Sequence, residues 1–167
     1  MRTLYLLRHA KSSWDHPGLD DFDRPLNDRG LHNAPFMAGL FKARNEALDL
    51  IITSPAARAL ATAQAVRDAW EGSPPPFLQD RSIYLASVGQ MLGVLGRLPD
   101  NAEHVLLVGH NPGISELCEA LCDAGLGDLP TAAMVRIDLH IDQWQEIASG
   151  TGSLVWSDHP KRHPEAY

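Results

Sequence analysis

Arginine and histidine side chains follow directly after three short apolar segments of this 167-residue chain. The segments and the motifs that follow them are Leu4–Leu7 with Arg8 and His9, Asp49–Ile52 with Thr53–Arg58, and His104–Val108 with Gly109–Pro112, which contains His110. An arginine offers a planar fork of donors that stays charged and suits phosphate oxygens. A neutral imidazole can attack phosphorus as a nucleophile. Together these residues predict a pocket for a phosphoryl group with a histidine nucleophile.

The four residues have distinct expected roles. His9 has an ordinary pKa of about 6.5, which makes an unprotonated ring nitrogen available at neutral pH. Arg58 is expected near the start of a helix, with its side chain leaning back toward the helix N-terminus. His110 precedes another helix start, where free N–H groups favour an anion. A cationic His110 would stabilise the equatorial phosphoryl oxygens, and Asn111 is expected to cap this helix and to help bind the phosphate.

Strands and helices alternate along the sequence. Five strands are expected, at Thr3–Leu7, Leu48–Ile52, Phe77–Gln79, Val105–Val108 and Met134–Ile141, with Trp144–Ala148 pairing with the last as an edge hairpin. Helices are expected from an Asn27 cap to Arg44, from a Ser54 cap with Pro55 at its first position to Gly72, from Ser87 to Leu98, and from Asn111-Pro112 to Ala124. This order predicts an α/β three-layer sandwich with a mostly parallel central sheet and helices on both faces. In such sheets ligands bind beyond the carboxyl ends of the strands, where all three motifs lie.

Composition and charge limit the function classes. The chain is 44% hydrophobic and 21% charged, as expected for one globular domain over residues 1–167. A net charge of −7 argues against an extended nucleic-acid surface, and no apolar run is long enough to span a membrane. Cys118 and Cys122 are expected to be reduced core thiols, because a disulfide four residues apart on one helix would be strained. No signal peptide is recognised, and a cytoplasmic protein is expected.

Combined, the motifs resemble those of the histidine phosphatase superfamily, which includes phosphoglycerate mutases and acid phosphatases. The closer resemblance is to its small phosphohistidine phosphatases of the SixA type. The segments that carry it are Leu4–Trp14, Asp21–Gly30, Thr53–Ala59 with Thr62 and Ala63, Val108–Pro112, and Gly152–Trp156 with His159–Lys161. The resemblance implies a phosphoglycerate mutase-like fold. By position it implies that His9 is the phosphorylated nucleophile, and that Arg8, Arg58 and His110 bind the phosphoryl group. It also implies neither a metal nor an organic cofactor.

One expected feature of the larger superfamily members is missing. These members carry an acidic proton donor in the segment that corresponds to Ser82–Ser87, which contains no acid. Asp80 lies before the expected place, and no long insertion could form a lid. A phosphohistidine leaves as an imidazole, which is far less basic than an alkoxide and needs an acid less. Both absences favour phosphohistidine on a partner protein as the substrate.

Three alternatives stay open at this point. The loop with Asp15, Asp20, Asp21 and Asp23 could supply a proton donor, although it is interpreted as a solvated segment. The enzyme could instead hydrolyse small phosphate esters or anhydrides. The chain could also be a phosphate-binding module without turnover, although binding alone does not require a nucleophile at His9. Phosphate or sulfate is expected in the pocket in each case.

Overall fold

Six strands form one mixed sheet in the order β3-β2-β4-β1-β5-β6. The computed structural model describes all 167 residues. The strands are β1 (Arg2–Arg8), β2 (Leu50–Thr53), β3 (Phe77–Gln79), β4 (His104–Gly109), β5 (Met134–Leu139) and β6 (Gly152–Asp158). Pairing is parallel from β3 through β2 and β4 to β1, and antiparallel from β1 to β5 and from β5 to β6. The mostly parallel α/β sheet expected from the sequence is therefore confirmed.

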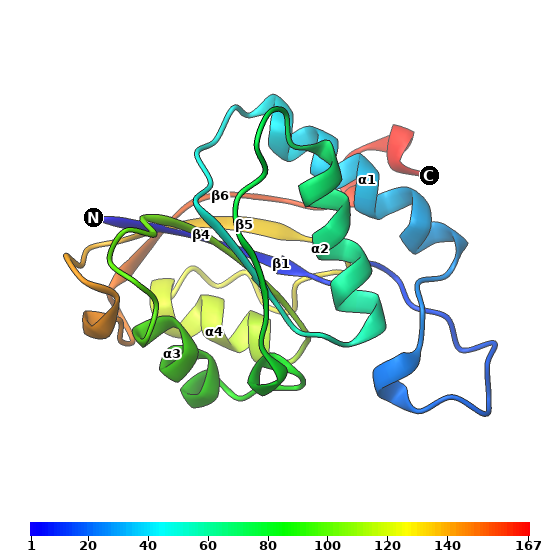
Figure 1. Cartoon of the computed structure of the whole chain (residues 1–167), viewed down its shortest axis with the longest axis horizontal. Helices are drawn as coiled ribbons and strands as arrows, with labels where there is room; N and C mark the ends of the chain where they lie inside the picture. Colours follow the sequence, from blue (N-terminus) through cyan, green and yellow to red (C-terminus); the bar gives the residue numbers. More distant parts are fainter.

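Four helices cover the two faces of this sheet. They are α1 (Asp28–Ala43), α2 (Ala57–Ala69), α3 (Val88–Gly96) and α4 (Gly113–Cys122). Figure 1 shows α1 and α2 on one face of the sheet and α3 and α4 on the other. Successive residues of a strand point to opposite faces, so Leu4 and Leu6 pack with α3 and α4, whereas Tyr5 and Leu7 pack with α1 and α2. Burial on both faces explains why the parallel strands are continuous apolar runs.

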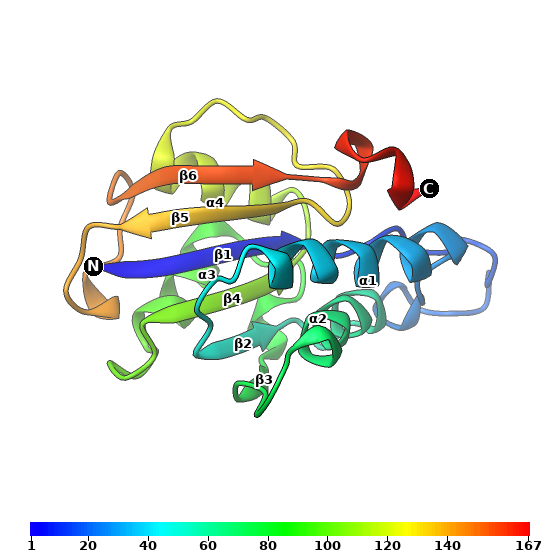
Figure 2. The ribbon, with the colours of Figure 1, turned by 90° about the horizontal axis from the view of Figure 1, so that it is seen from above.

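The parallel strands β1, β2 and β4 end at one edge of the sheet. Figure 2 shows the long loop after β1 and the C-terminal segment at that same edge, beside α1. The three sequence motifs follow these three strand ends and are brought to one place. None of the four α-helices combines the length and the apolar character that a membrane crossing needs.

The start of α1 agrees with the sequence-based expectation, whereas the starts of α2 and α4 differ from it. The expected cap of α1 at Asn27 is confirmed, because the Asn27 side chain accepts the N–H of Gly30. The expected start at Ser54-Pro55 is wrong, because α2 begins at Ala57. The N–H of Ser54 still donates to the carbonyl of Val108, at 3.0 Å, which keeps Ser54 in extended backbone.

The helix after β4 also begins without the predicted cap. Asn111 does not cap α4, since Pro112 holds the cap position and makes no side-chain hydrogen bond there. The Asn111 amide donates to the carbonyl of Leu129 at 3.0 Å, and its oxygen accepts from the hydroxyl of Ser115 at 2.6 Å. The side chain therefore joins the start of α4 to the loop before β5.

The predicted hairpin at Trp144–Ala148 is also wrong. The partner of β5 is β6, and Trp144–Glu146 forms a short 3₁₀ helix. The Trp144 side chain is completely buried, and its indole N–H donates to the carbonyl of Ala102. Burial of this large side chain turns the segment into the core and away from the sheet edge. Cys118 and Cys122 carry free thiols, as expected.

A glycine in the first turn of α1 sets how closely this helix approaches the loop after β1. A Cβ atom at Gly30 would lie 2.1 Å from the carbonyl oxygen of Lys11, whereas a Cβ at Gly39 of the same helix would meet nothing within 4 Å. We expect Gly30→Ala to lower the free energy of unfolding by about 1–3 kcal/mol, as overpacking usually does. Gly39→Ala is the matched control and should be neutral or stabilising by up to about 1 kcal/mol. Urea denaturation of both variants measures the difference, and equal stabilities would contradict the proposed close packing.

Candidate functional site

The four predicted side chains come together at the carboxyl ends of β1, β2 and β4. Arg8 pairs in register with Gly109, and the N–H of His9 donates to the carbonyl of Gly109 at 3.1 Å. This pairing places His9 beside His110, with ring centroids 5.2 Å apart. His9, Arg58 and His110 are buried, and Arg8 is half-buried.

A threonine of α2 ties Arg58 to the end of β1. The N–H of Ala10 donates to Oγ1 of Thr62 at 2.9 Å, and the same hydroxyl donates to the carbonyl of Arg58 at 2.8 Å. The helix turn that carries Arg58 is thereby joined to the residue that follows His9. The arginine comes from the second residue of α2, close to the helix start that the sequence predicts for it.

His9 has one ring nitrogen engaged and one open. Its Nδ1 lies 2.7 Å from the carbonyl oxygen of Ala10, an acceptor that requires the proton on Nδ1. Nε2 then carries the lone pair that a nucleophile needs. Burial lowers the pKa of His9 to about 4, and the positive charges of Arg58 and Arg8 contribute to the shift. His9 is therefore neutral at neutral pH, as the sequence-based interpretation requires.

His110 is neutral at neutral pH in this structure, whereas the sequence-based expectation is a cation beside a phosphoryl group. Burial is the largest cause that lowers its pKa, to about 3, with His9 and Arg58 adding to the effect. Its Nε2 lies 2.8 Å from the hydroxyl of Ser54, which already accepts the N–H of Ala56. The Ser54 hydroxyl can donate its hydrogen to Nε2, and in that tautomer Nδ1 of His110 carries the proton. An entering anion would raise the pKa of His110, because opposite charge favours the protonated ring.

Both arginines keep one buried nitrogen without a partner. Arg8 uses Nη1 to donate to the carbonyl of Leu129 at 2.8 Å, and Arg58 uses Nη1 and Nη2 to bind Asp21. The Nε atoms of both arginines are buried and unpartnered, as is Nδ1 of His110. Only one other buried side-chain nitrogen or oxygen in the chain lacks a partner, Nδ1 of His159. Buried donors without acceptors are unfavourable and are rare in folded proteins.

Asp21 is a site residue that the sequence analysis did not separate from its loop. Its carboxylate accepts from Arg58 Nη2 at 2.9 Å, from the hydroxyl of Tyr84 at 2.6 Å and from Arg24 Nε at 3.1 Å. Its backbone carbonyl accepts from Arg58 Nη1 at 2.7 Å. Asp21 is solvent-exposed, as the interpretation of this loop expects, but its carboxylate is held by specific contacts. The only local signal was its spacing of three residues from Arg24, since Arg58 and Tyr84 are distant in sequence.

Asp21 is ionised at neutral pH. Partial burial raises the pKa of the Asp21 carboxyl. The hydrogen bonds from Tyr84 and Arg58, together with the positive charge of Arg58, outweigh this effect and lower the pKa to about 2. The second acid named from the sequence, Asp80, caps the short 3₁₀ helix Arg81–Ile83 and accepts from Ser82. Ser82–Ser87 itself contributes Tyr84, whose ring lies edge-on to His110 with centroids 5.4 Å apart. The contacts of Asp21 therefore favour its carboxylate form and not a neutral carboxylic acid.

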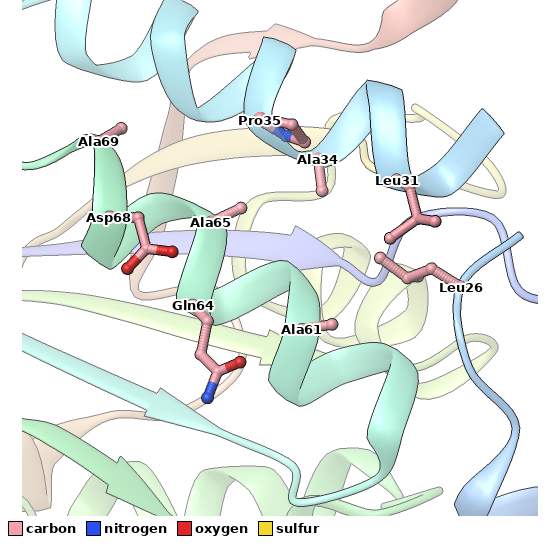
Figure 3. A pocket seen from close by; sticks show the side chains of 9 residues that line it. All are labelled: Leu26, Leu31, Ala34, Pro35, Ala61, Gln64, Ala65, Asp68 and Ala69. Carbon is pink, nitrogen blue, oxygen red and sulfur yellow. The ribbon is translucent and has the colours of Figure 1, made fainter. Parts of the chain in front are cut away.

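An apolar cavity of about 420 Å³ lies apart from these residues, between α1 and α2. It is lined by Leu26, Leu31, Ala34, Pro35, Ala61, Gln64, Ala65, Asp68 and Ala69 (Figure 3). None of the four predicted site residues lines it, and its only charged side chain is that of Asp68. The four predicted site residues therefore lie at the strand ends and outside this cavity. No group of three or more His, Cys, Asp or Glu side chains in the chain is arranged to hold a metal ion.

Comparison with known proteins agrees with the fold and with the strand-end motifs. Residues 4–82 match the profile of the histidine phosphatase superfamily (branch 1). An uncharacterised protein of Mycobacterium tuberculosis is 31% identical, over 93% of this chain and 100% of its own. A structure from Agrobacterium tumefaciens, assigned to the phosphohistidine phosphatase SixA, superposes with a TM-score of 0.80 at 30% identity and covers 95% of this chain and 98% of its own.

A further solved structure supports the fold. It is the protein histidine phosphatase SixA complexed with tungstate, which superposes with a TM-score of 0.79 at 23% identity and covers 96% of this chain and 98% of its own. The resemblance stated from the sequence motifs is confirmed by these matches. The chain belongs to the histidine phosphatase superfamily and is a protein of the SixA type.

Proposed function

We propose that this protein is a phosphatase that removes the phosphoryl group from phosphohistidine on a partner protein, with His9 as the nucleophile. One observation carries the proposal. Three of the four buried, unpartnered side-chain nitrogens belong to Arg8, Arg58 and His110, the residues predicted to bind phosphate. A phosphoryl group beside His9 would supply the acceptors that these donors lack.

In the first step, the lone pair of His9 Nε2 attacks phosphorus. The substrate reacts with a proton on the other nitrogen of its ring, so that when the bond from phosphorus to the leaving nitrogen breaks, this nitrogen keeps the electron pair and a neutral imidazole departs without a proton from the enzyme. In the second step, water attacks the phosphorus of the enzyme intermediate, and the bond to Nε2 breaks to release inorganic phosphate and free His9. Arg8, Arg58 and His110 stabilise the charge on the equatorial oxygens in both steps.

Leaving-group chemistry favours phosphohistidine over an ester. An alkoxide leaving group needs a proton from an acid, and Asp21, the carboxylate nearest to Arg58, is ionised. We expect phosphohistidine to be cleaved best, activated aryl phosphates next and alkyl phosphates least, with the missing acid costing alkyl esters about 10²–10⁴-fold in rate. Rates of dephosphorylation plotted against leaving-group pKa test this order. A flat plot would contradict it and would favour a phosphatase of small esters.

Asp21→Asn separates a positioning role from proton donation in the same assay. Because asparagine keeps an oxygen that accepts from Arg58 but loses the charge, we expect a similar, modest fall in rate for phosphohistidine and for the esters. A loss confined to the alkyl phosphates would show that Asp21 is the proton donor. Tyr84→Phe is the matched control, since it removes one hydrogen bond to Asp21 and leaves its charge.

The pH dependence of the reaction follows from the pKa of His9. With the pKa lowered to about 4, the ring stays neutral through weakly acidic solution. We expect kcat/KM for an aryl phosphate, corrected for the ionisation of the substrate, to fall tenfold per pH unit only below about pH 4. An acid limb near the ordinary histidine value of about 6.5 would contradict the buried, neutral nucleophile.

Unfolding provides an independent measure of the same shift. The folded pKa values of His9 and His110 lie below the unfolded value of about 6.5, so the unfolded chain binds more protons between that pH and about pH 3. The free energy of unfolding should therefore fall as pH is lowered through this window. His9→Gln should reduce the slope of the free energy of unfolding against pH. Chemical denaturation at several pH values across this window measures that slope.

A further inference from the structure

A second cavity, next to Arg8, is lined by cationic side chains. It has a volume of about 200 Å³, and its cations are Arg8, Lys11, Arg29 and Lys161. No acidic side chain lines it, although the chain as a whole has a net charge of −7. We call this cavity the basic subsite. Four like charges around so small a space repel one another unless an anion lies among them.

None of the four cations of the basic subsite is in an ion pair. The lysine and arginine side chains within 4.0 Å of a carboxylate are Arg2, Arg24, Lys42, Arg44, Arg58 and Arg136. Asp128 acts on Arg8 electrostatically, but from beyond ion-pair distance. The basic subsite therefore holds positive charge that the protein itself does not neutralise by direct contact.

The fold brings these cations together from separate segments. Close packing of Gly30 on the carbonyl of Lys11 places the first turn of α1, with Arg29, beside the loop after β1. The 3₁₀ helix Pro160–Arg162 contributes Lys161. The C-terminal segment also contacts α1 directly, since the guanidinium carbon of Arg29 lies 4.8 Å from the ring centroid of Tyr167. Figure 2 shows this C-terminal segment lying along α1 at the carboxyl edge of the sheet. The arrangement depends on tertiary packing and not on one run of basic residues.

Arg8 connects the basic subsite to the proposed phosphoryl site. It lines the cavity, it directly precedes His9, and its Nε is buried without a partner. Arg58, in contrast, is paired with Asp21, so its charge is partly neutralised by direct contact. A second negative group of the substrate is thus attracted more strongly to the unpaired cations beside Arg8.

We propose that the basic subsite binds a second anionic group of the substrate, a carboxylate or a phosphate, next to the phosphoryl group that is removed. The inference rests on the proposed function and specifies its substrate class. Cavities that hold whole organic ligands measure about 300–1,000 Å³, so 200 Å³ suits a single charged group. Acidic side chains beside the phosphohistidine of a partner protein, or the second phosphate of a bisphosphorylated small molecule, share this chemistry.

Matched pairs of ligands test the basic subsite by binding. One pair consists of peptides with a non-hydrolysable phosphohistidine analogue flanked on both sides by glutamate or by glutamine. The other pair consists of the bisphosphate and the monophosphate of one short alkanediol. We expect wild-type protein to bind the more anionic member of at least one pair about tenfold more tightly, and Arg29→Gln/Lys161→Gln to abolish that preference.

A control variant with the same change in net charge is Arg67→Gln/Arg97→Gln, because both arginines are exposed and neither lines the basic subsite. It should keep the preference. Tighter binding of the glutamate-flanked peptide identifies the second anionic group as an acidic side chain of a partner protein. Tighter binding of the bisphosphate, without a preference between the two peptides, identifies it as a second phosphate. No preference in either pair, or one that survives in Arg29→Gln/Lys161→Gln, would overturn the proposal.

Turnover keeps this outcome separate from the proposed function. Phosphoramidate, which carries no second anionic group, should be hydrolysed equally well by wild type and by Arg29→Gln/Lys161→Gln. Failure of wild type to hydrolyse any phosphohistidine would count against the proposed function while leaving the binding result intact. If Arg29→Gln/Lys161→Gln lost phosphoramidate hydrolysis as strongly as it lost binding of the more anionic ligands, the cations would act on the phosphoryl site itself. That result would also overturn the proposal of a basic subsite.

Discussion

Replacing His9 by alanine is expected to reduce phosphohistidine turnover by at least about 10³-fold, because the reaction then lacks its nucleophile. The neutral Nε2 of this ring is the only nucleophile that we assign to the site, since Nε2 of His110 is engaged with the hydroxyl of Ser54. Wild-type protein mixed with substrate and quenched in alkali should carry an acid-labile, alkali-stable phosphate. The His9→Ala protein should carry none.

The control for this experiment is a histidine outside the site. His140 is exposed and hydrogen-bonds to Ser153 on the neighbouring strand, so His140→Ala should retain both turnover and the labelled intermediate. Chemical denaturation should show that His9→Ala still folds. Substantial remaining activity in a folded His9→Ala protein would mean that the nucleophile is misassigned.

Replacing Arg58 by alanine is expected to reduce kcat/KM by about 30–1,000-fold, equivalent to about 2–4 kcal/mol of transition-state stabilisation. The reason is that a buried guanidinium, oriented by two hydrogen bonds to Asp21, is lost from the anion site. Arg58→Lys should recover only part of the rate, because a compact ammonium group lacks the planar fork by which the guanidinium binds Asp21 through Nη1 and Nη2 and leaves Nε for the anion. Arg8→Ala should show a loss of similar size.

Steady-state kinetics and inhibition by tungstate measure this effect on the reaction and on anion binding. Arg67→Ala is the matched control, since Arg67 is an exposed arginine of the same helix α2 and stacks on Phe77. It should leave both quantities unchanged. Unaltered tungstate inhibition in Arg58→Ala and Arg8→Ala would place the anion elsewhere and contradict the assignment of the site.

The sequence was sufficient to predict the residues of the candidate site, because the patterns that indicate them involve neighbouring residues. Apolar runs that end in Arg8-His9 or in Gly109-His110 identify buried strands and their polar ends without reference to distant residues. Alternating strands and helices then require a parallel sheet, whose carboxyl ends meet at one edge. The Asn27 cap and the cap at Ser87, which forms a capping box with Gln90, are equally local, and the structure contains both.

Local signals failed where a distant contact competes with them. Ser54 has the residue type of a helix cap, but strand pairing with Val108 and a contact with His110 determine its conformation. Trp144 has the residue type of a strand, but its burial against Ala102 produces a 3₁₀ turn. In each case the partner lies more than 40 residues away, so no pattern near the residue could reveal it.

By itself, then, the sequence determined the α/β architecture, the family and the four residues proposed to carry the chemistry. Only the tertiary structure decided their protonation and their surroundings. Burial makes His9 and His110 neutral. Arg58 hydrogen-bonds to Asp21, which lies 37 residues earlier in the sequence. Packing of the C-terminal segment on α1 assembles the basic subsite. The physical reason is that desolvation and charge interactions depend on distances in the folded chain, whereas strand and helix patterns depend on neighbours along the sequence.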